Sequence, residues 1–388
     1  MNSEKKPFIY VDHAATTRIT DSVRAAMEPY LTTAFGNASA AYGAGRAASR
    51  AILHARRRIA SVLGCRPQEI FFTSGGTESD NWAIKGSAFM HRLQGHMIYS
   101  AVEHHAVLHS MRFVGQMGMQ TSEIPVTSDG IVTPDAVSAA MRDDTHLAAV
   151  MLANNEIGTI QPIAEIAHAV HERGAVLLCD AVQAMGQIPV DVSAHGADLL
   201  SLSGHKIGAP KGIGLLYIRE GTPILPLLDG GGQELHMRAG TENTAAIVGL
   251  AQAIEDAVSL SGVESMRRLQ TRLFDGLREI PGCVVNGTAD PKHRLPGNVN
   301  VSFPGLDSES LVLHLDRAGI CCSAASACTA GVSEPSHVLL AIGCDGDAAI
   351  SSLRFSLGKE NTAEEIDTVL SVLRTVVENL YKESRAFI

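Results

Sequence analysis

The sequence predicts an α/β fold with a large domain built on a mostly parallel sheet, followed by a smaller α+β domain. Between about residues 69 and 218, short apolar runs alternate with amphipathic segments of helical period, as in a parallel sheet covered by helices on both faces. After about residue 260, helices and strands interleave differently. The 388 residues, 45% hydrophobic and 19% charged, are enough for two globular cores.

The N-terminal part begins with a short expected strand at Pro7–Val11 and a loop at residues 12–17. Ala48–Leu63 has the apolar spacing of an amphipathic helix, and Gly64 is a typical helix stop. Later strands are expected at Glu69–Thr73, Met97–Ser100, Leu147–Leu152, Ala175–Cys179, Leu199–Ser203 and Gly214–Ile218. The helices between them are expected at Glu78–Arg92, His105–Gly115, Pro134–Met141 and Ile163–Arg173.

A long helical pattern over Ala245–Ser261 leaves this sheet. Beyond it we expect helices at Val263–Arg278, Ser308–Arg317 and Thr362–Tyr381, with strands at Val299–Phe303 and Leu353–Leu357. We therefore place a large domain at residues 16–260 and a small domain at residues 1–15 and 261–388.

Charge and cysteine content narrow the class of protein. A net charge of −10 argues against direct nucleic-acid binding, so a small anionic substrate must be captured by local groups. The seven cysteines lack paired CxxC spacing, which indicates neither a disulfide framework nor a zinc ribbon. No signal peptide or apolar run of membrane-spanning length is apparent, so we expect a cytoplasmic protein without membrane contact.

Two strand ends carry a pair of residues suited to pyridoxal phosphate (PLP). Lys206 closes Ser203-Gly204-His205-Lys206 after one apolar run, and Asp180 closes another. PLP chemistry needs a lysine amine for a Schiff base and a carboxylate that keeps the pyridine nitrogen protonated. Taken alone, Asp180 has the alternative of a helix cap, and a lysine such as Lys206 is more often simply solvated. Because ligands bind beyond the carboxyl ends of parallel strands, their joint occurrence favours a PLP site.

Two neighbouring segments fit the same cofactor. Phe71–Ser79 reads as a strand, a glycine turn and a helix start, which suits phosphate, although an ordinary capped turn looks the same. His104 follows a predicted strand, where an imidazole could stack on the pyridine ring and handle protons. The i, i+4 pair His105 and His109 raises the alternative of a metal site, but no suitable third ligand is near, so we expect no metal.

The motifs identify the chain as similar, nearly end to end, to the PLP-dependent cysteine desulfurases of the NifS/IscS type, in the class V aminotransferase family. The resemblance implies the type I PLP-dependent transferase fold, with a mostly parallel seven-stranded sheet in the large domain. It rests on Gly75-Gly76-Thr77-Glu78-Ser79-Asp80-Asn81, Asn154-Asn155-Glu156-Ile157-Gly158-Thr159, Asp180-Ala181-Val182-Gln183, Ser203-Gly204-His205-Lys206, Arg238-Ala239-Gly240-Thr241-Glu242-Asn243, Ser326-Ala327-Cys328-Thr329 and Arg354-Phe355-Ser356-Leu357-Gly358.

The resemblance also implies roles for single residues. Lys206 would hold PLP as a Schiff base, Asp180 would pair with the pyridine nitrogen, Gln183 would hydrogen-bond the ring hydroxyl oxygen, and His104 would stack on the ring. Four residues would bind the phosphate: Gly76, Thr77, Ser203 and His205.

Three further residues extend the implied site. Thr241 would reach the phosphate of the partner subunit's cofactor, which implies a homodimer. Asn155, beside the cofactor, and Arg354 would hold the carboxylate of the substrate L-cysteine, a task for which a bidentate guanidinium is suited.

Cys328 determines which PLP reaction the resemblance implies. It lies in a small, polar segment, where a mobile loop is expected. Its thiolate would attack the sulfur of bound L-cysteine and become a persulfide, alanine would leave, and the sulfur would pass to an acceptor protein. The alternative for Cys328 is a small buried hydrophobe. Cys321 and Cys322 are expected on or beside a buried strand, with sulfur relay as their alternative.

Other activities remain open at this stage. A class V transaminase would not need Cys328, a selenocysteine lyase would release little sulfur from cysteine, and a sulfur-relay or scaffold protein could keep the fold without catalysis. Iron–sulfur cluster assembly, tRNA thiolation and cofactor sulfuration are all possible destinations of the sulfur. The chain ends at Ile388 without the longer tail that helps the IscS branch dock a scaffold, which puts the usual scaffold partnership in doubt. The sulfur acceptor is expected to be a scaffold or a tRNA-thiolation partner.

Overall fold

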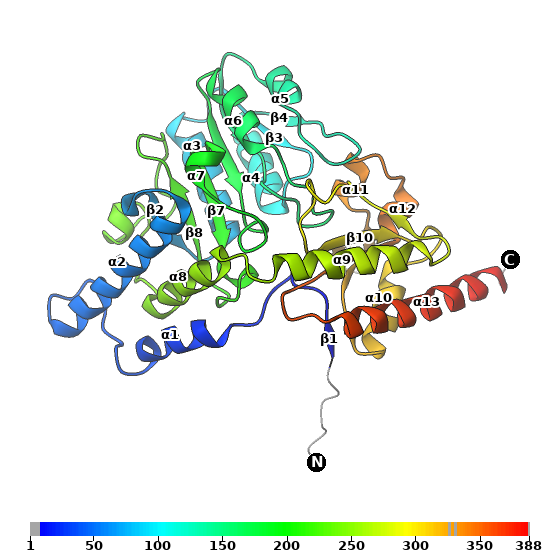
Figure 1. Ribbon diagram of the computed structural model, residues 1–388. Coiled ribbons are helices and arrows are strands. Elements are labelled where there is room, and N and C mark those ends of the chain that lie inside the picture. Colours follow the sequence, from blue (N-terminus) through cyan, green and yellow to red (C-terminus); the bar gives the residue numbers. More distant parts are fainter. Residues whose placement is uncertain (1–7, 325–326, 330–331, 387–388) are drawn as a thin grey trace.

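The computed structural model describes residues 8–324, 327–329 and 332–386, with the backbone alone at 327–329, 332–334 and 384–386. Its main element is a seven-stranded sheet in the order β2-β8-β7-β6-β5-β3-β4 (Figure 1). Neighbouring strands are parallel from β7 through β6, β5 and β3 to β4, and β8 runs antiparallel to both β7 and β2. The strands are β2 Ile70–Thr73, β3 His96–Ser100, β4 Gln120–Ile124, β5 Thr145–Ala149, β6 Val176–Asp180, β7 Leu199–Ser203 and β8 Gly214–Ile218. This confirms the predicted mostly parallel sheet.

Helices cover both faces of the sheet, because alternate side chains of each strand enter different apolar clusters. On β5, Ala148 packs with one cluster, while Leu147 and Ala149 pack with the other. The first face carries α2 Gly43–Leu63, α5 Pro134–Ala140, α6 Ile163–His171 and α8 Thr244–Val258. The second carries α3 Gly76–Met90 and α4 His105–Gln116. Two more helices are α1 Asp21–Leu31 and α7 Val192–His195.

A second sheet in the order β12-β15-β10-β9 has its own apolar core, formed with α9, α10 and α13 (Figure 1). Its strands are β9 Val284–Val285, β10 Asn298–Ser302, β12 Ser323–Ala324 and β15 Ser352–Ser356. The helices of this part are α9 Val263–Arg278, α10 Ser308–Arg317, α11 His337–Ala341, α12 Gly346–Ile350 and α13 Ala363–Ala386. Two short strand pairs are β1 Ile9–Tyr10 with β11 Ile320–Cys321, and β13 Ala327–Thr329 with β14 Val332–Glu334. The proposed boundary near residue 260 stays a prediction.

The N-terminal segment connects the two sheets. β1 pairs with β11, and Asp12 forms a bridge with Ser356 of β15. A few residues later the amide of Thr17 donates to the carbonyl of His205. Residues 9–17 therefore run from the second sheet to the carboxyl end of β7.

The sequence analysis did not predict several of these elements, among them β4 and α1. β4 has one buried, two half-buried and two exposed residues, so it lacks the apolar run by which a buried strand is recognised. α1 has a single buried residue, Val23, and contains Pro29. Among the described residues no single helix is long and apolar enough to cross a membrane; the bent pair α8 and α9 meets that criterion jointly, by length and composition only.

Candidate active site

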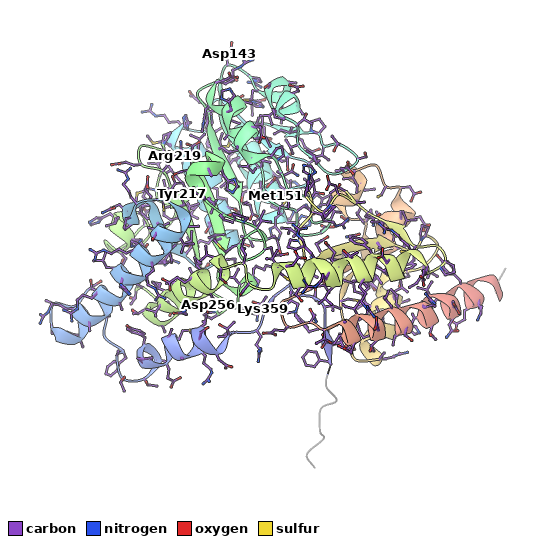
Figure 2. All side chains as sticks on the ribbon, in the orientation of Figure 1. Asp143, Met151, Tyr217, Arg219, Asp256 and Lys359 are labelled. Atoms are coloured by element: carbon purple, nitrogen blue, oxygen red, sulfur yellow. The ribbon has the colours of Figure 1, made fainter. Side chains whose placement is uncertain are left out.

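A cavity of about 330 Å³ lies at the carboxyl ends of β5, β6 and β7. Met151, which lines it, is labelled near the middle of the view in Figure 2. The polar lining residues come from strand ends, the start of α3, the N-cap of α4 and β15: Gly76, Thr77, Asp80, His104, Asn155, Asp180, Gln183, Ser203, His205, Lys206 and Arg354. The cavity therefore gathers polar groups that are far apart in sequence, from Gly76 to Arg354.

Lys206 follows β7 in a short 3₁₀ turn, Gly204–Lys206. Its Nζ donates to the carbonyl oxygens of Ala14 and Ala15 at 2.6 and 2.9 Å. Burial lowers the pKa of Lys206 to about 8, and the positive charge of Arg354 adds to this shift. An amine with such a pKa is available as a nucleophile or base near neutral pH.

Buried carboxyl groups surround the other end of the cavity. Asp180 is the last residue of β6, and its Oδ1 accepts a hydrogen bond of 2.9 Å from the Val182 amide. Burial raises the pKa of Asp180 to about 6, while that hydrogen bond and Lys206 oppose the shift. Burial and the charge of Asp180 raise the pKa of Asp80 well above its usual range, and burial raises the pKa of Glu103 to about 8. Burial and the charge of Asp180 therefore both disfavour a second negative charge at Asp80.

The start of α3 offers room for an anion. Gly75, the N-cap, has a φ of 153°, and a Cβ on Gly76 would lie 2.8 Å from Cγ2 of Val182. The unpaired amides of the first helical turn, beside Thr77 and Ser203, suit a phosphate.

Two histidines of the cavity are neutral near pH 7. Burial and the charge of Lys206 lower the pKa of His104 to about 4, and the same causes lower that of His205 to about 4. Nδ1 of His104 accepts a hydrogen bond from the Ala106 amide at 3.1 Å, so the proton of the neutral ring lies on Nε2. His104 is therefore available as a donor through Nε2.

Arg354, on β15, brings a positive charge to the cavity from the second sheet. Its Nη1 donates to the carbonyl of Asn155 at 3.0 Å, and its Nη2 donates to Asp12 Oδ1 and Ser323 Oγ at 3.0 and 3.1 Å. Its Nε is buried and has no hydrogen-bond partner among the described residues. The guanidinium group lines the cavity, and its positive charge suits a substrate carboxylate.

These residues fit PLP. The cavity holds an amine of lowered pKa, a buried carboxylate, a helix start cleared of side chains, and an imidazole. Gln183 is 8% exposed, and its Nε2 donates to Ala14 O at 2.9 Å. When bound, PLP would be held by Lys206, by Asp180 at its ring nitrogen and by the start of α3 at its phosphate.

The structure brings ten of the twelve predicted site residues around this cavity. Thr241 is exposed and lies outside it. Cys328 lies on β13, opposite Ser333, and its side chain lies outside the described part of the chain. The roles assigned to all twelve stay predictions.

Sequence reasoning assigned no role to Asp80, a buried acidic residue that lines the cavity. Its position four residues into α3, facing the sheet beside the glycine turn, is the signal that could have indicated it.

A second cavity of about 140 Å³ shares Gln183 and Lys206 with the first, and its lining includes Asp256 and Lys359, labelled in Figure 2.

Comparison with known proteins adds independent information. Residues 9–369 match the family model described as aminotransferase class-V. The chain is 48% identical over 381 residues to a protein named cysteine desulfurase IscS from Methanosarcina thermophila, covering 97% of this chain and 94% of that protein. It is 45% identical over 374 residues to the IscS of Clostridium botulinum strain Hall, covering 95% and 94%.

Solved structures with a similar fold also include proteins of the NifS type. A structure titled NifS-like protein superposes with a TM-score of 0.90 at 37% identity, covering 96% of this chain and all (100%) of that one. A structure titled SspA in complex with cysteine superposes with a TM-score of 0.81 at 36% identity, covering 91% and 100%.

Proposed function

This chain belongs to the class V aminotransferase family, and we propose that it is a PLP-dependent cysteine desulfurase acting on free L-cysteine. The observation that carries the proposal is the cavity that joins the Lys206 amine, the Asp180 carboxylate and the Arg354 guanidinium. The relatives named cysteine desulfurase, and the cysteine-bound structural relative, support the substrate.

Each residue would act through the atoms described above. Arg354 binds the substrate carboxylate through its guanidinium group, beside Asn155. Bound PLP supplies an electron sink for the negative charge that develops on the substrate. Lys206 accepts the Cα proton as a free amine, and His104 supplies a proton from Nε2.

Cys328 would take the sulfur. The bond between Cβ and sulfur in L-cysteine breaks, a sulfur–sulfur bond forms at Cys328, and the Cys328 thiol proton replaces the sulfur on the carbon skeleton. The two products are L-alanine and a Cys328 persulfide, so the reaction needs no outside oxidant or reductant. A thiol acceptor then removes the outer sulfur by exchange.

The same proposal includes a homodimer. Large apolar side chains are exposed on the described surface, among them Phe35 at 80% and Leu235, six positions before Thr241, at 57%. Covering such side chains in a partner interface would be favourable, and Thr241 would then face the partner's cofactor. Analytical ultracentrifugation tests this, since a monomer at micromolar concentration would contradict it.

We also place the activity in the cytoplasm, with a protein as the sulfur acceptor. The six cysteines with described side chains are free thiols, as is usual in a reducing compartment. Iron–sulfur cluster assembly, tRNA thiolation and cofactor sulfuration are the three acceptor pathways to test, by offering purified acceptor proteins of each kind to the persulfide form.

The deciding experiment measures alanine and sulfide released from L-cysteine in the presence of a thiol reductant. We expect equal amounts from the wild type, and loss of both from Cys328→Ala, which keeps its PLP absorbance. Full activity in Cys328→Ala would refute the persulfide step. Pyruvate or keto-acid-dependent turnover without sulfide would indicate a transaminase instead.

A further inference from the structure

Both ends of the segment that carries Cys328 are fixed to the substrate-binding part of the cavity. At its N-terminal end, Ser323 of β12 accepts a hydrogen bond from Arg354 and donates one to Asp12. At its C-terminal end, Ser336 follows β14 directly after Pro335 and begins α11. Ser336 lies eight positions after Cys328 and is 5% exposed (336 − 328).

Ser336 is bound to Glu156. Its hydroxyl donates to Glu156 Oε2 at 2.5 Å and accepts from the Leu339 amide at 3.2 Å as the N-cap of α11. A short hydroxyl–carboxylate hydrogen bond at a partly buried position is among the stronger neutral–ion contacts in proteins. It therefore fixes the last residues of the segment to the loop after β5.

The backbone of Glu156 is held by hydrogen bonds from the second sheet. Its carbonyl oxygen accepts hydrogen bonds from the side-chain amides of Asn298 and Asn300 on β10, at 2.9 and 3.2 Å. Its neighbour Asn155 lines the cavity and accepts from Arg354. Glu156 thus joins the first sheet, the second sheet and the predicted carboxylate site.

The start of α11 is held by further contacts with the same region. The ring of His337 lies 2.9 Å, through Nε2, from the carbonyl of Glu103. Val338 and Leu339 pack against Val102 and Ile157, which follow β3 and β5. These apolar contacts keep α11 in place, but the Ser336–Glu156 bond is the one that acts directly on the end of the Cys328 segment.

We propose that Glu156 is a positioning residue that, through Ser336, sets the location of the Cys328 segment relative to the bound substrate carboxylate. It touches neither substrate nor cofactor. Its loss would leave L-cysteine binding intact and slow the attack of the Cys328 thiolate on the substrate sulfur, because that attack depends on sub-ångström placement. The inference rests on the proposed function.

The test separates binding from sulfur transfer in Ser336→Ala. The affinity for L-cysteine is measured from the visible absorbance change of the PLP-loaded enzyme, and persulfide on Cys328 is measured by quenched mass spectrometry in a single turnover. We expect affinity within about twofold of wild type and persulfide formation slowed roughly 10-fold or more. We expect Ser336→Thr, which keeps the hydroxyl, to restore the rate.

The alkylation rate of Cys328 in PLP-free protein gives a readout independent of turnover, and it should rise in Ser336→Ala. Ser22→Ala is the matched control, because the hydroxyl of Ser22, on the exposed helix α1, donates a hydrogen bond of the same 2.5 Å length to Oδ2 of Asp256 on α8. Glu156→Gln provides the same comparison if Ser336→Ala does not fold.

The outcomes separate the two claims. If the wild type forms no persulfide, the proposed function fails, and this inference with it. If the wild type forms persulfide and Ser336→Ala does so at the same rate, the positioning role alone is refuted. A parallel loss of affinity and rate in Ser336→Ala, or in Ser22→Ala, would also refute it, since that is the result of general destabilisation.

Discussion

Lys206 should react as a free amine at a pH far below that of an ordinary lysine. Burial is the largest cause of its lowered pKa and Arg354 the second, and together they bring it from 10.5 to about 8. At about pH 7.5, roughly a quarter of such an amine is unprotonated, against roughly 0.1% for an unperturbed lysine. The structure therefore predicts a reactivity gain of roughly 200-fold from ionisation alone.

The assay follows the PLP-free protein across pH. A limiting amount of an amine-reactive reagent is added, and modification of Lys206 is quantified by mass spectrometry, with the rate of PLP uptake as a second measure. We expect the unprotonated form to appear with a midpoint near pH 8. Lys382, which lies on the surface helix α13, serves as the internal reference in the same sample.

Two substitutions should move this midpoint in opposite directions. Arg354→Gln removes a charge that lowers the pKa of Lys206, so the midpoint rises; Asp12→Asn removes a charge that raises it, so the midpoint falls. A wild-type midpoint above about pH 10 would refute the reasoning, since unperturbed lysines titrate there. Shifts of the same sign in both variants would show that Arg354 and Asp12 act through packing rather than charge.

Three further results are expected. Gly76→Ala places a Cβ 2.8 Å from Val182 Cγ2, so PLP titration should show affinity reduced about 10-fold, at an overpacking cost of about 1–3 kcal/mol; unchanged affinity would contradict the close approach. Glu234→Gln breaks a buried ion pair with Arg56, so urea unfolding should show a loss of about 3 kcal/mol, and a loss below about 1 kcal/mol would argue against it. Arg354→Lys should raise the KM for L-cysteine about 10-fold with a smaller change in kcat, since an ammonium lacks the planar fork; an unchanged KM would remove Arg354 from carboxylate binding.

The sequence was most informative where polar residues follow apolar runs. Asp180 ends one buried strand and Lys206 follows another by three residues, and parallel strands carry their ends to one edge of the sheet. His104 followed from the same pattern after β3. The local signal and the tertiary position agree at these points, so the cavity could be anticipated from single strands.

Other features depend on contacts that no local pattern carries. Arg294 is 1% exposed, and burial lowers its pKa to about 9, yet an arginine in a polar loop reads as a surface residue. The three left-handed residues 234–236 contain no glycine, and the buried pair of Glu234 with Arg56, 178 positions away, stabilises them. The hydrogen bond from Ser336 to Glu156 could not be predicted from the sequence either, because a serine before a helix predicts only a cap.

The route of the N-terminal segment has a consequence for how the protein is made. Ala14 N donates to Ser356 Oγ across 342 positions, and Asp12 accepts from Arg354 across the same interval. At ribosomal speeds of roughly 5–20 residues per second, residues 9–17 wait about 20–70 seconds before their partners exist. The first sheet can form during synthesis, whereas the lysine-binding carbonyls of Ala14 and Ala15 can settle only afterwards. We therefore expect PLP to bind only at the end of biosynthesis. In a chain stalled before β15, the contacts that hold Ala14 and Ala15 beside Lys206 would still be missing.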